Sequence, residues 1–229
     1  MKIMKKTKKL ILFCIAVLAV GAAVFFLGRA VFPARADAFG FALIALCAVL
    51  ILCAVFEGSR LSVLRISLIS VMTALSVCGR AVFYAVPFFK PVSAVVILCG
   101  MYLGPVAGMI CGAMSALLSG VFFGYGLWLP FQMLAWGMIG AFSGILRAPM
   151  KKSRLLLCAF GALSGVVFSA FMDIFTVLNF GNGFDVAMYA AAVVSALPVT
   201  AVYAVSNVIF LLALCRPVEK KLSRVLSAY

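Results

Sequence analysis

Apolar residues run through almost the whole chain in long stretches, and short clusters of proline, glycine and charge separate one stretch from the next. A helix needs about 17 to 25 mostly apolar residues to cross a lipid bilayer. Stretches of about this length predict eight membrane-spanning helices, at Leu10–Leu27, Phe39–Phe56, Ser62–Val86, Phe88–Leu103, Pro105–Phe123, Pro130–Leu146, Leu155–Leu178 and Val186–Leu214. No polar stretch long enough for a separate globular domain interrupts them. The pattern therefore predicts an all-α fold, a polytopic bundle of membrane helices.

Hydrophobic residues make up 67% of the 229 positions and charged residues only 10%, a balance that excludes a soluble domain. The chain has no histidine, so catalytic dyads and triads that depend on histidine are excluded and a zinc site is not expected. Its eight cysteines include no C-x-x-C pair, and no phosphate-binding G-x-x-x-x-G-K-[ST] motif is present. The sequence therefore predicts no enzyme activity, no metal and no cofactor.

The net charge of +14 comes from basic residues that gather at the ends of apolar stretches, so binding to nucleic acid is not expected. When the eight helices alternate across the membrane, fifteen of the nineteen basic residues fall on the side of the two termini. Because basic loops stay in the cytoplasm, we predict a multi-pass protein of the cell membrane with both termini cytoplasmic. The first helix is interpreted as a retained anchor, although Ala34-Arg35-Ala36 offers a signal-peptide cleavage site after it.

Small residues recur at helical spacing in two of the predicted helices. The first stripe is Gly104, Gly108, Gly112, Ala116 and Gly120, and the second is Gly161, Gly165 and Ser169. Stripes of this kind let helix backbones approach each other closely in a membrane. We interpret them as helix-packing surfaces.

Two of the charged residues inside predicted helices, Asp173 and Arg80, lie at a similar depth toward the outer side. Asp173 is the only acidic residue inside a predicted helix, and a charge there costs several kcal/mol unless it is paired or reaches water. Arg80 is the nearest candidate partner. We therefore expect the two to be near neighbours that neutralise each other, and a structural pair and a role in ligand binding both remain open.

The outer ends of the predicted helices are rich in aromatic residues, and the cytoplasmic ends are poorer in them. An interfacial belt of aromatic residues is one explanation. The loops Gly124–Trp128 and Asn179–Gly183, however, place flexible backbone beside these rings. We therefore favour an outward-facing pocket in which the rings and amides of these loops contact a flat or bulky ligand.

Five short motifs stand out in the centre of the chain. They are Gly79-Arg80, Lys90-Pro91-Val92-Ser93-Ala94, Gly104-Pro105-Val106-Ala107-Gly108, Phe123-Gly124-Tyr125-Gly126-Leu127-Trp128 and Gln132-Met133-Leu134-Ala135-Trp136-Gly137. In these motifs the chain resembles the substrate-binding S components of energy-coupling factor (ECF) vitamin transporters, most closely the cobalamin-type group. The resemblance covers about residues 62–214. It implies a six-helix core over residues 61–229 with a basic cytoplasmic tail, preceded by a two-helix hairpin over residues 1–60.

An S component captures a vitamin outside the cell and docks on a transmembrane coupling subunit that two cytoplasmic ATPase subunits drive. This division of labour explains why the chain has no ATP-binding motif. Docking in this family uses small residues at A-x-x-x-A spacing on the first core helix, and the matching positions are Ser70 and Ala74, with serine in place of the first alanine. Cys78 continues the same spacing. The resemblance therefore implies a coupling surface made of Ser70, Ala74 and Cys78.

The predicted function is capture of a vitamin or a related small molecule, with cobalamin or another corrinoid as the leading ligand. Two other classes stay open. A membrane scaffold would bind other helices and no small molecule, and an intramembrane enzyme would need a catalytic constellation that the chain lacks. The candidate substrate-binding residues are Arg80, Tyr84, Lys90, Tyr125, Trp128, Gln132, Asp173, Asn179 and Asn182.

Overall fold

The computed structural model describes residues 61–181 and 184–227, and in addition positions 16, 19–21, 23 and 47. Within the two long ranges the chain is helical and contains no strand. This confirms the predicted all-α membrane bundle. The predicted hairpin over residues 1–60, with its helices Leu10–Leu27 and Phe39–Phe56, lies outside the two ranges, and so does Asn182.

The described helices follow one another as α3 (Val63–Val82), α4 (Val92–Leu103), α5 (Pro105–Phe123), α6 (Leu129–Ile145), α7 (Arg147–Lys152), α8 (Arg154–Phe180), α9 (Val186–Ser195) and α10 (Leu197–Ser227). By length and composition α3, α5, α8 and α10 can cross a membrane, whereas α4, α6 and α9 are shorter apolar helices. The bounds of α5 agree with the prediction, and those of α6 and α8 agree to within two residues. The short helix α7 was not predicted.

The connection between α3 and α4 is longer than predicted. α3 ends at Val82, and α4 begins at Val92 instead of four residues earlier. Phe88 has a φ of 60°, a left-handed conformation that interrupts a helix, and Pro91 then caps α4. With 12 residues α4 is about 18 Å long, less than the ~30 Å of a bilayer's hydrocarbon core. The helix within the predicted span Phe88–Leu103 is therefore shorter than predicted, and its crossing of the membrane stays a prediction.

The last predicted helix, Val186–Leu214, is two helices in the structure. α9 ends at Ser195, and α10 runs from Leu197 past the predicted end to Ser227. Pro198 gives the physical reason for the break. A proline cannot donate the backbone hydrogen bond that would continue α9, but it fits the first turn of a new helix.

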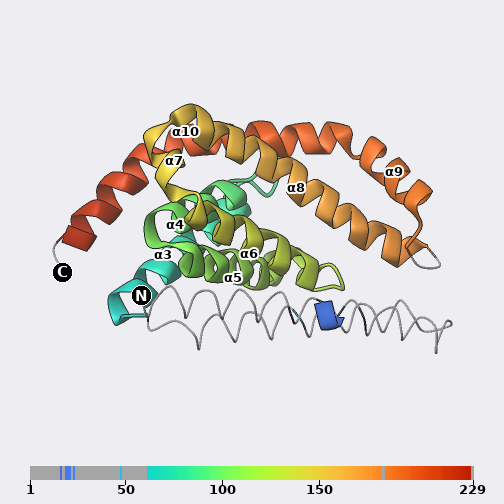
Figure 1. Ribbon diagram of the computed structural model, residues 1–229, viewed down its shortest axis with the longest axis horizontal. Coiled ribbons are helices and arrows are strands. Elements are labelled where there is room, and N and C mark those ends of the chain that lie inside the picture. Colours follow the sequence, from blue (N-terminus) through green and yellow to red (C-terminus); the bar gives the residue numbers. More distant parts are fainter. Residues whose placement is uncertain are drawn as a thin grey trace.

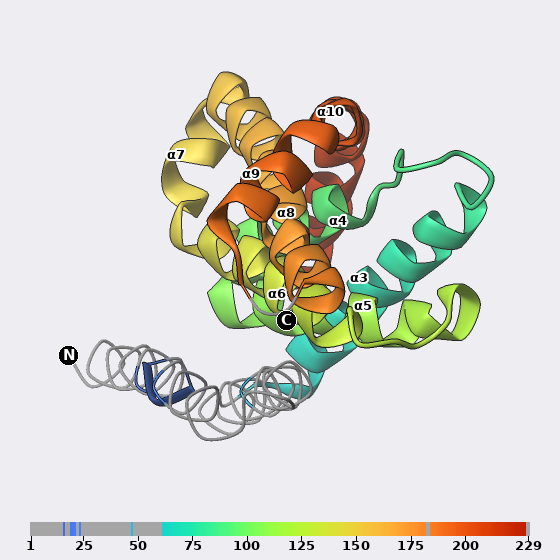
Figure 2. The same ribbon diagram turned by 90° about the vertical axis from the view of Figure 1, so that its right-hand side faces the viewer.

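α8 and α10 lie side by side, above α4, α5 and α6 in the view of Figure 1. α3 packs against α4 and α5 and lies away from α8, as the turned view in Figure 2 shows. α7 and the end of α10 lie at one end of the bundle, and the α5–α6 connection and the end of α8 lie at the other. The first of these, which we call the basic end, carries Arg147, Lys151, Lys152, Arg154, Arg216, Lys220, Lys221 and Arg224.

The first small-residue stripe packs α5 against α6, which confirms its interpretation as a helix-packing surface. A Cβ added to Gly108 would overlap the backbone carbonyl of Gly140, and one added to Gly112 would overlap the carbonyl of Trp136. Gly104 has a different role. It forms the junction between α4 and α5 with a φ of 102°, a conformation that glycine adopts without strain.

The second stripe packs α8 against α10. A Cβ added to Gly165 would lie 2.7 Å from the backbone nitrogen of Ala204, so the two helices approach closely at this point. One turn further on, Ser169 Oγ accepts a hydrogen bond of 2.6 Å from Thr200 Oγ1. The two stripes thus bring two pairs of helices into close contact, α5 with α6 and α8 with α10.

Candidate substrate-binding cavity

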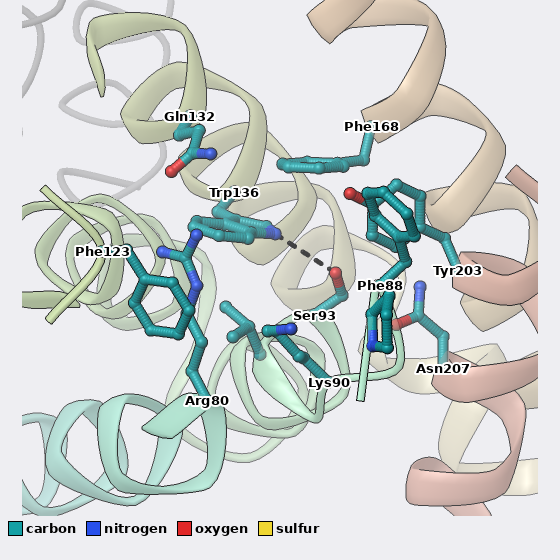
Figure 3. Close-up of a pocket in the computed structure, with 12 residues that line it drawn as sticks. Arg80, Phe88, Lys90, Ser93, Phe123, Gln132, Trp136, Phe168, Tyr203 and Asn207 are labelled. Carbon is teal, nitrogen blue, oxygen red and sulfur yellow. Dashed lines mark hydrogen bonds between the residues drawn. The ribbon is translucent and has the colours of Figure 1, made fainter. Parts of the chain in front are cut away.

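A cavity of about 320 Å³ lies in the half of the bundle away from the basic end (Figure 3). It is found where α3 and α5 end and where α4 and α6 begin, with α8 and α10 closing its far side. Its lining residues are Arg80, Pro87, Phe88, Lys90, Val92, Ser93, Phe123, Gln132, Trp136, Phe168, Tyr203 and Asn207. Aromatic rings with a few polar groups among them are typical of a small-molecule site.

Arg80 comes from the last turn of α3 and points toward α5 and α6 (Figure 3). Its guanidinium donates a hydrogen bond to Ser119 Oγ, and it lies 4.3 Å from the ring centroid of Phe123 and 5.0 Å from that of Trp136. Cation–π contacts of this kind contribute about 0.5–2 kcal/mol each. Arg80 Nε is buried without a hydrogen-bond partner among the described residues. Rings and one hydroxyl, rather than an acid, therefore surround this charge.

Trp136 forms the middle of the cavity wall and is only 5% exposed. Its Nε1 donates a hydrogen bond of 3.2 Å to Ser93 Oγ, which ties α6 to the first turn of α4. Its ring stacks on Phe168 of α8, with the centroids 4.9 Å apart and the planes 12° apart. Because both its edge and one face are held, the indole is fixed before any ligand arrives.

The α3–α4 connection brings Phe88 and Lys90 to the cavity. The Phe88 ring meets Tyr203 edge-on at a centroid distance of 5.8 Å. Lys90 Nζ donates a hydrogen bond of 3.1 Å to a backbone carbonyl of the same connection and lies 5.8 Å from the ring centroid of Phe123. Burial lowers the pKa of the Lys90 ammonium below its ordinary value, and the nearby charge of Arg80 lowers it further. Two positive charges therefore face one phenylalanine ring.

α10 contributes Asn207, a buried amide. Its Nδ2 donates hydrogen bonds to the Gly161 carbonyl at 3.1 Å and to Ser164 Oγ at 3.2 Å, both on α8. The amide nitrogen thus joins two helices, and the side-chain oxygen is left to accept a hydrogen bond from a ligand. The preceding residue, Ser206, donates a hydrogen bond of 3.1 Å to the Lys90 carbonyl and so holds the α3–α4 connection against α10.

Three predicted substrate-binding residues, Arg80, Lys90 and Gln132, line the cavity. They come from three separate elements: α3, the α3–α4 connection and α6. Gln132 lies one turn before Trp136 on α6, with its amide beside the indole (Figure 3). Together they add two positive charges and one amide to a wall that is otherwise mostly aromatic.

The other predicted residues that the structure describes do not line the cavity. Tyr84 is 65% exposed and packs against Phe123 with the ring centroids 5.3 Å apart. Tyr125 and Trp128 are exposed in the α5–α6 connection, and Asn179 is exposed near the end of α8. Contact between these four residues and a ligand stays a prediction.

The expected ion pair between Arg80 and Asp173 is not formed in the described part of the chain. Asp173 is 9% exposed on α8 and does not line the cavity. The reason lies in the packing order, because α3 packs against α4 and α5 while α8 lies on the other side of these helices. Arg80 therefore reaches the rings of α5 and α6 instead of the acid.

The sequence did not reveal most of the residues that form the wall, above all Trp136, Phe168, Tyr203 and Asn207. Asn207 carried a usable signal, because a polar amide inside a long apolar stretch often marks a functional position in a membrane protein. Phe168 and Tyr203 carried none. An aromatic residue in a membrane helix can face lipid, another helix or a cavity, and its spacing alone does not distinguish these.

The predicted coupling surface lies on the free face of α3. Ser70, Ala74 and Cys78 are all exposed, whereas the buried residues of the same helix face α4 and α5. The surface is therefore accessible to a partner helix. Its role in docking stays a prediction.

Residues 60–223 match the model of a protein family described as ECF-type riboflavin transporter, S component. The match covers more than two thirds of the chain and includes every residue that lines the cavity. This match does not confirm the resemblance to the cobalamin-type group. No curated protein and no solved structure matches the chain.

Proposed function

The chain belongs to the ECF-type riboflavin transporter S component family, and we propose that its cavity captures a flat heteroaromatic vitamin of the riboflavin class. As a member of this family it is a membrane-embedded substrate-binding component that works with a transmembrane coupling subunit and ATPase subunits. The observation that carries the proposal is the cavity, with its volume and its aromatic wall.

The volume favours a ligand of this size over the corrinoid expected from the sequence. At about 320 Å³ the cavity lies at the lower end of the range of about 300–1,000 Å³ that small-molecule pockets span. A tricyclic ring with a short polyol chain suits such a volume. A corrin macrocycle with its nucleotide arm needs several times more space, so a ligand of the riboflavin class replaces cobalamin as the leading candidate.

The wall supplies both kinds of contact that a flat heteroaromatic ring needs. Trp136, Phe123 and Phe88 offer ring faces and edges. Gln132 and Asn207 offer amide groups that can pair with ring nitrogens and carbonyl oxygens. Ring contacts give affinity and polar contacts give orientation, so this set supports binding without covalent chemistry.

The distribution of charge supports an outward-facing cavity. Basic residues gather at the opposite end of the bundle, in α7, at the start of α8 and in the last turns of α10. The positive-inside rule places such an end in the cytoplasm. The cavity then faces the outside of the cell, where an uptake system meets its substrate.

Equilibrium binding to the purified full-length chain tests this proposal. Riboflavin fluorescence should be quenched saturably at a stoichiometry of one, and cobalamin should neither bind nor compete. Trp136→Phe should weaken riboflavin binding about tenfold, because it removes a buried wall residue that is held by Ser93. Trp128→Phe, the matched change outside the cavity, should weaken binding much less.

Two results would contradict the proposal. Binding of cobalamin without binding of riboflavin would make a corrinoid the leading ligand candidate again. A loss of affinity in Trp128→Phe but not in Trp136→Phe would move the binding site to the α5–α6 connection.

We also propose that the stripe of Ser70, Ala74 and Cys78 docks on the coupling subunit. Lipid tails are as apolar as leucine, so a smooth helix face gains most when another helix backbone packs closely against it. Ala74→Leu should therefore block co-purification with the coupling subunit and abolish ATP-driven uptake, while riboflavin affinity of the isolated chain stays near normal.

Ala159→Leu is the matched control for this docking surface, because Ala159 is an exposed alanine on α8, away from α3. It should leave both assembly and binding intact. Normal assembly of Ala74→Leu, or an equal loss of assembly in both variants, would argue against docking through α3.

A further inference from the structure

The cavity holds two positive charges and, among the described residues that line it, no negative one. Arg80 Cζ and Lys90 Nζ lie 4.3 Å and 5.8 Å from the same ring centroid, that of Phe123. The two charges are therefore separated by no more than about 10 Å, the Debye length at 0.1 M salt. In a partly buried site they repel each other, and this makes the empty cavity costly to maintain.

No described acid offsets either charge. Arg80 has a hydroxyl and two rings around it and keeps one buried N–H without a partner, and Lys90 donates only to a backbone carbonyl. Asp173 does not line the cavity, and Asp185 accepts from the Met188 backbone nitrogen as the N-cap of α9. The binding site is therefore built with uncompensated positive charge.

We propose that the ligand supplies the missing charge: it carries a carboxylate or a phosphate that lies between Arg80 and Lys90. This inference rests on the proposed function and narrows it, from a flat heteroaromatic vitamin to one with an acidic substituent. The fork of a guanidinium matches the oxygens of either group, and an ammonium on the other side adds a second charge-assisted contact. The flat ring then occupies the aromatic part of the cavity beside Trp136.

A matched pair of ligands separates charge from ring shape. Riboflavin and riboflavin 5′-phosphate share the same ring and polyol, and only the second carries a negative charge at neutral pH. Both are titrated onto the full-length chain in nanodiscs of zwitterionic phosphatidylcholine, so that no anionic lipid headgroup competes for the two cations. We expect the phosphate ester to bind at least tenfold more tightly than riboflavin.

Three variants test whether the preference for the phosphate ester arises from Arg80 and Lys90. Lys90→Gln and Arg80→Gln should each reduce the preference for the phosphate ester severalfold, while the affinity for neutral riboflavin changes much less. Lys151→Gln is the matched control, because Lys151 also lies over a ring, that of Tyr102 at 4.9 Å, but at the basic end. It should keep the full preference. Lys90 lies in the α3–α4 connection outside any helix. Lys90→Gln therefore still measures the preference for the phosphate ester if Arg80→Gln does not fold.

The outcomes are distinct. Equal affinities for the two ligands, or a preference that survives in Lys90→Gln, would overturn the proposed acidic substituent and leave riboflavin-class binding in place. Binding of neither ligand would overturn the proposed function, and this inference with it. A preference that disappears equally in Lys151→Gln would show that the net charge of the protein, rather than the cavity, attracts the anion.

Discussion

At one end of α5 and α6 the two helices touch through their backbones, and at the other end their side chains surround a cavity. In the first region Gly108 and Gly140 lie so close that neither has room for a Cβ. In the second region Phe123 and Trp136 stand apart with the Arg80 guanidinium near both rings. The same pair of helices thus provides both a contact between backbones and part of the wall of a cavity.

The difference shows how the closed region supports the open one. Gly112 touches the backbone carbonyl of Trp136, while the indole of the same Trp136 lines the cavity. The position of the Trp136 indole therefore depends on the backbone contact with Gly112, which leaves no room for an added atom. A binding side chain is held best when the backbone beneath it has no freedom to shift.

Adding one methyl group to the closed region should give the largest effect. In Gly108→Ala the new Cβ would meet the Gly140 carbonyl, which belongs to the backbone and cannot rotate away. We expect the free energy of unfolding to fall by about 2–3 kcal/mol, as for overpacked cores. Unfolding of the purified protein by sodium dodecyl sulfate in mixed micelles measures this change.

Gly137→Ala is the control for that experiment. Its Cβ would lie 3.5 Å from the Met109 carbonyl, an ordinary contact, so the variant should gain about 0.5–1 kcal/mol from the lower flexibility of alanine. Similar destabilisation of both variants would mean that any added methyl group is harmful in α5 and α6, and the argument from backbone contact would fail.

A change in the open region should affect binding more than stability. Phe123→Leu removes the ring that both cations face but keeps an apolar side chain at the end of α5. Riboflavin affinity should fall about tenfold, or about 1.4 kcal/mol, with a smaller change in unfolding free energy than in Gly108→Ala. Phe122→Leu, next to it but 60% exposed, should bind normally in the same titration. Equal losses in both variants would assign the effect to the end of α5 as a whole.

The closed region could be predicted from the sequence because its signal is periodic. Gly108 and Gly112 recur every fourth residue, and in a membrane helix this spacing has one common use, close packing against another helix. The ends of helices could also be predicted where proline and glycine stand at the end of an apolar stretch, as at Pro105. Where an apolar stretch continues across a break, as between α9 and α10, only the proline at position 198 marked it.

The open region could be predicted only in part, because its residues converge from six helices and the α3–α4 connection. Arg80 and Gln132 were predicted from a charge inside an apolar stretch and from a motif. Phe168 and Tyr203 come from α8 and α10, whose position relative to α6 depends on packing that no local pattern encodes. The error about Asp173 has the same cause, since equal depth in two helices does not imply that the helices are neighbours.

The smallest expected effect concerns Asp173. It is 9% exposed and forms no ion pair or hydrogen bond among the described residues. An acid without a partner gains nothing from its charge and loses hydration, so Asp173→Asn should leave the free energy of unfolding unchanged or raise it by about 1 kcal/mol or less. If Asp173 did neutralise Arg80, the same variant would instead lose about 3–5 kcal/mol, because breaking a buried pair strands the other charge.

A double-mutant cycle with Arg80→Gln decides between these expectations. In the structure the two side chains belong to helices on opposite sides of α4 and α5 and form no ion pair, although Tyr203 lies within electrostatic range of both. Because the two side chains do not contact each other, their effects on unfolding should add to within about 0.5 kcal/mol. A coupling energy well above that value would place the acid beside the guanidinium and would give the cavity the negative charge that its described lining lacks. Additive effects would leave Arg80 and Lys90 as charges that only a ligand can offset.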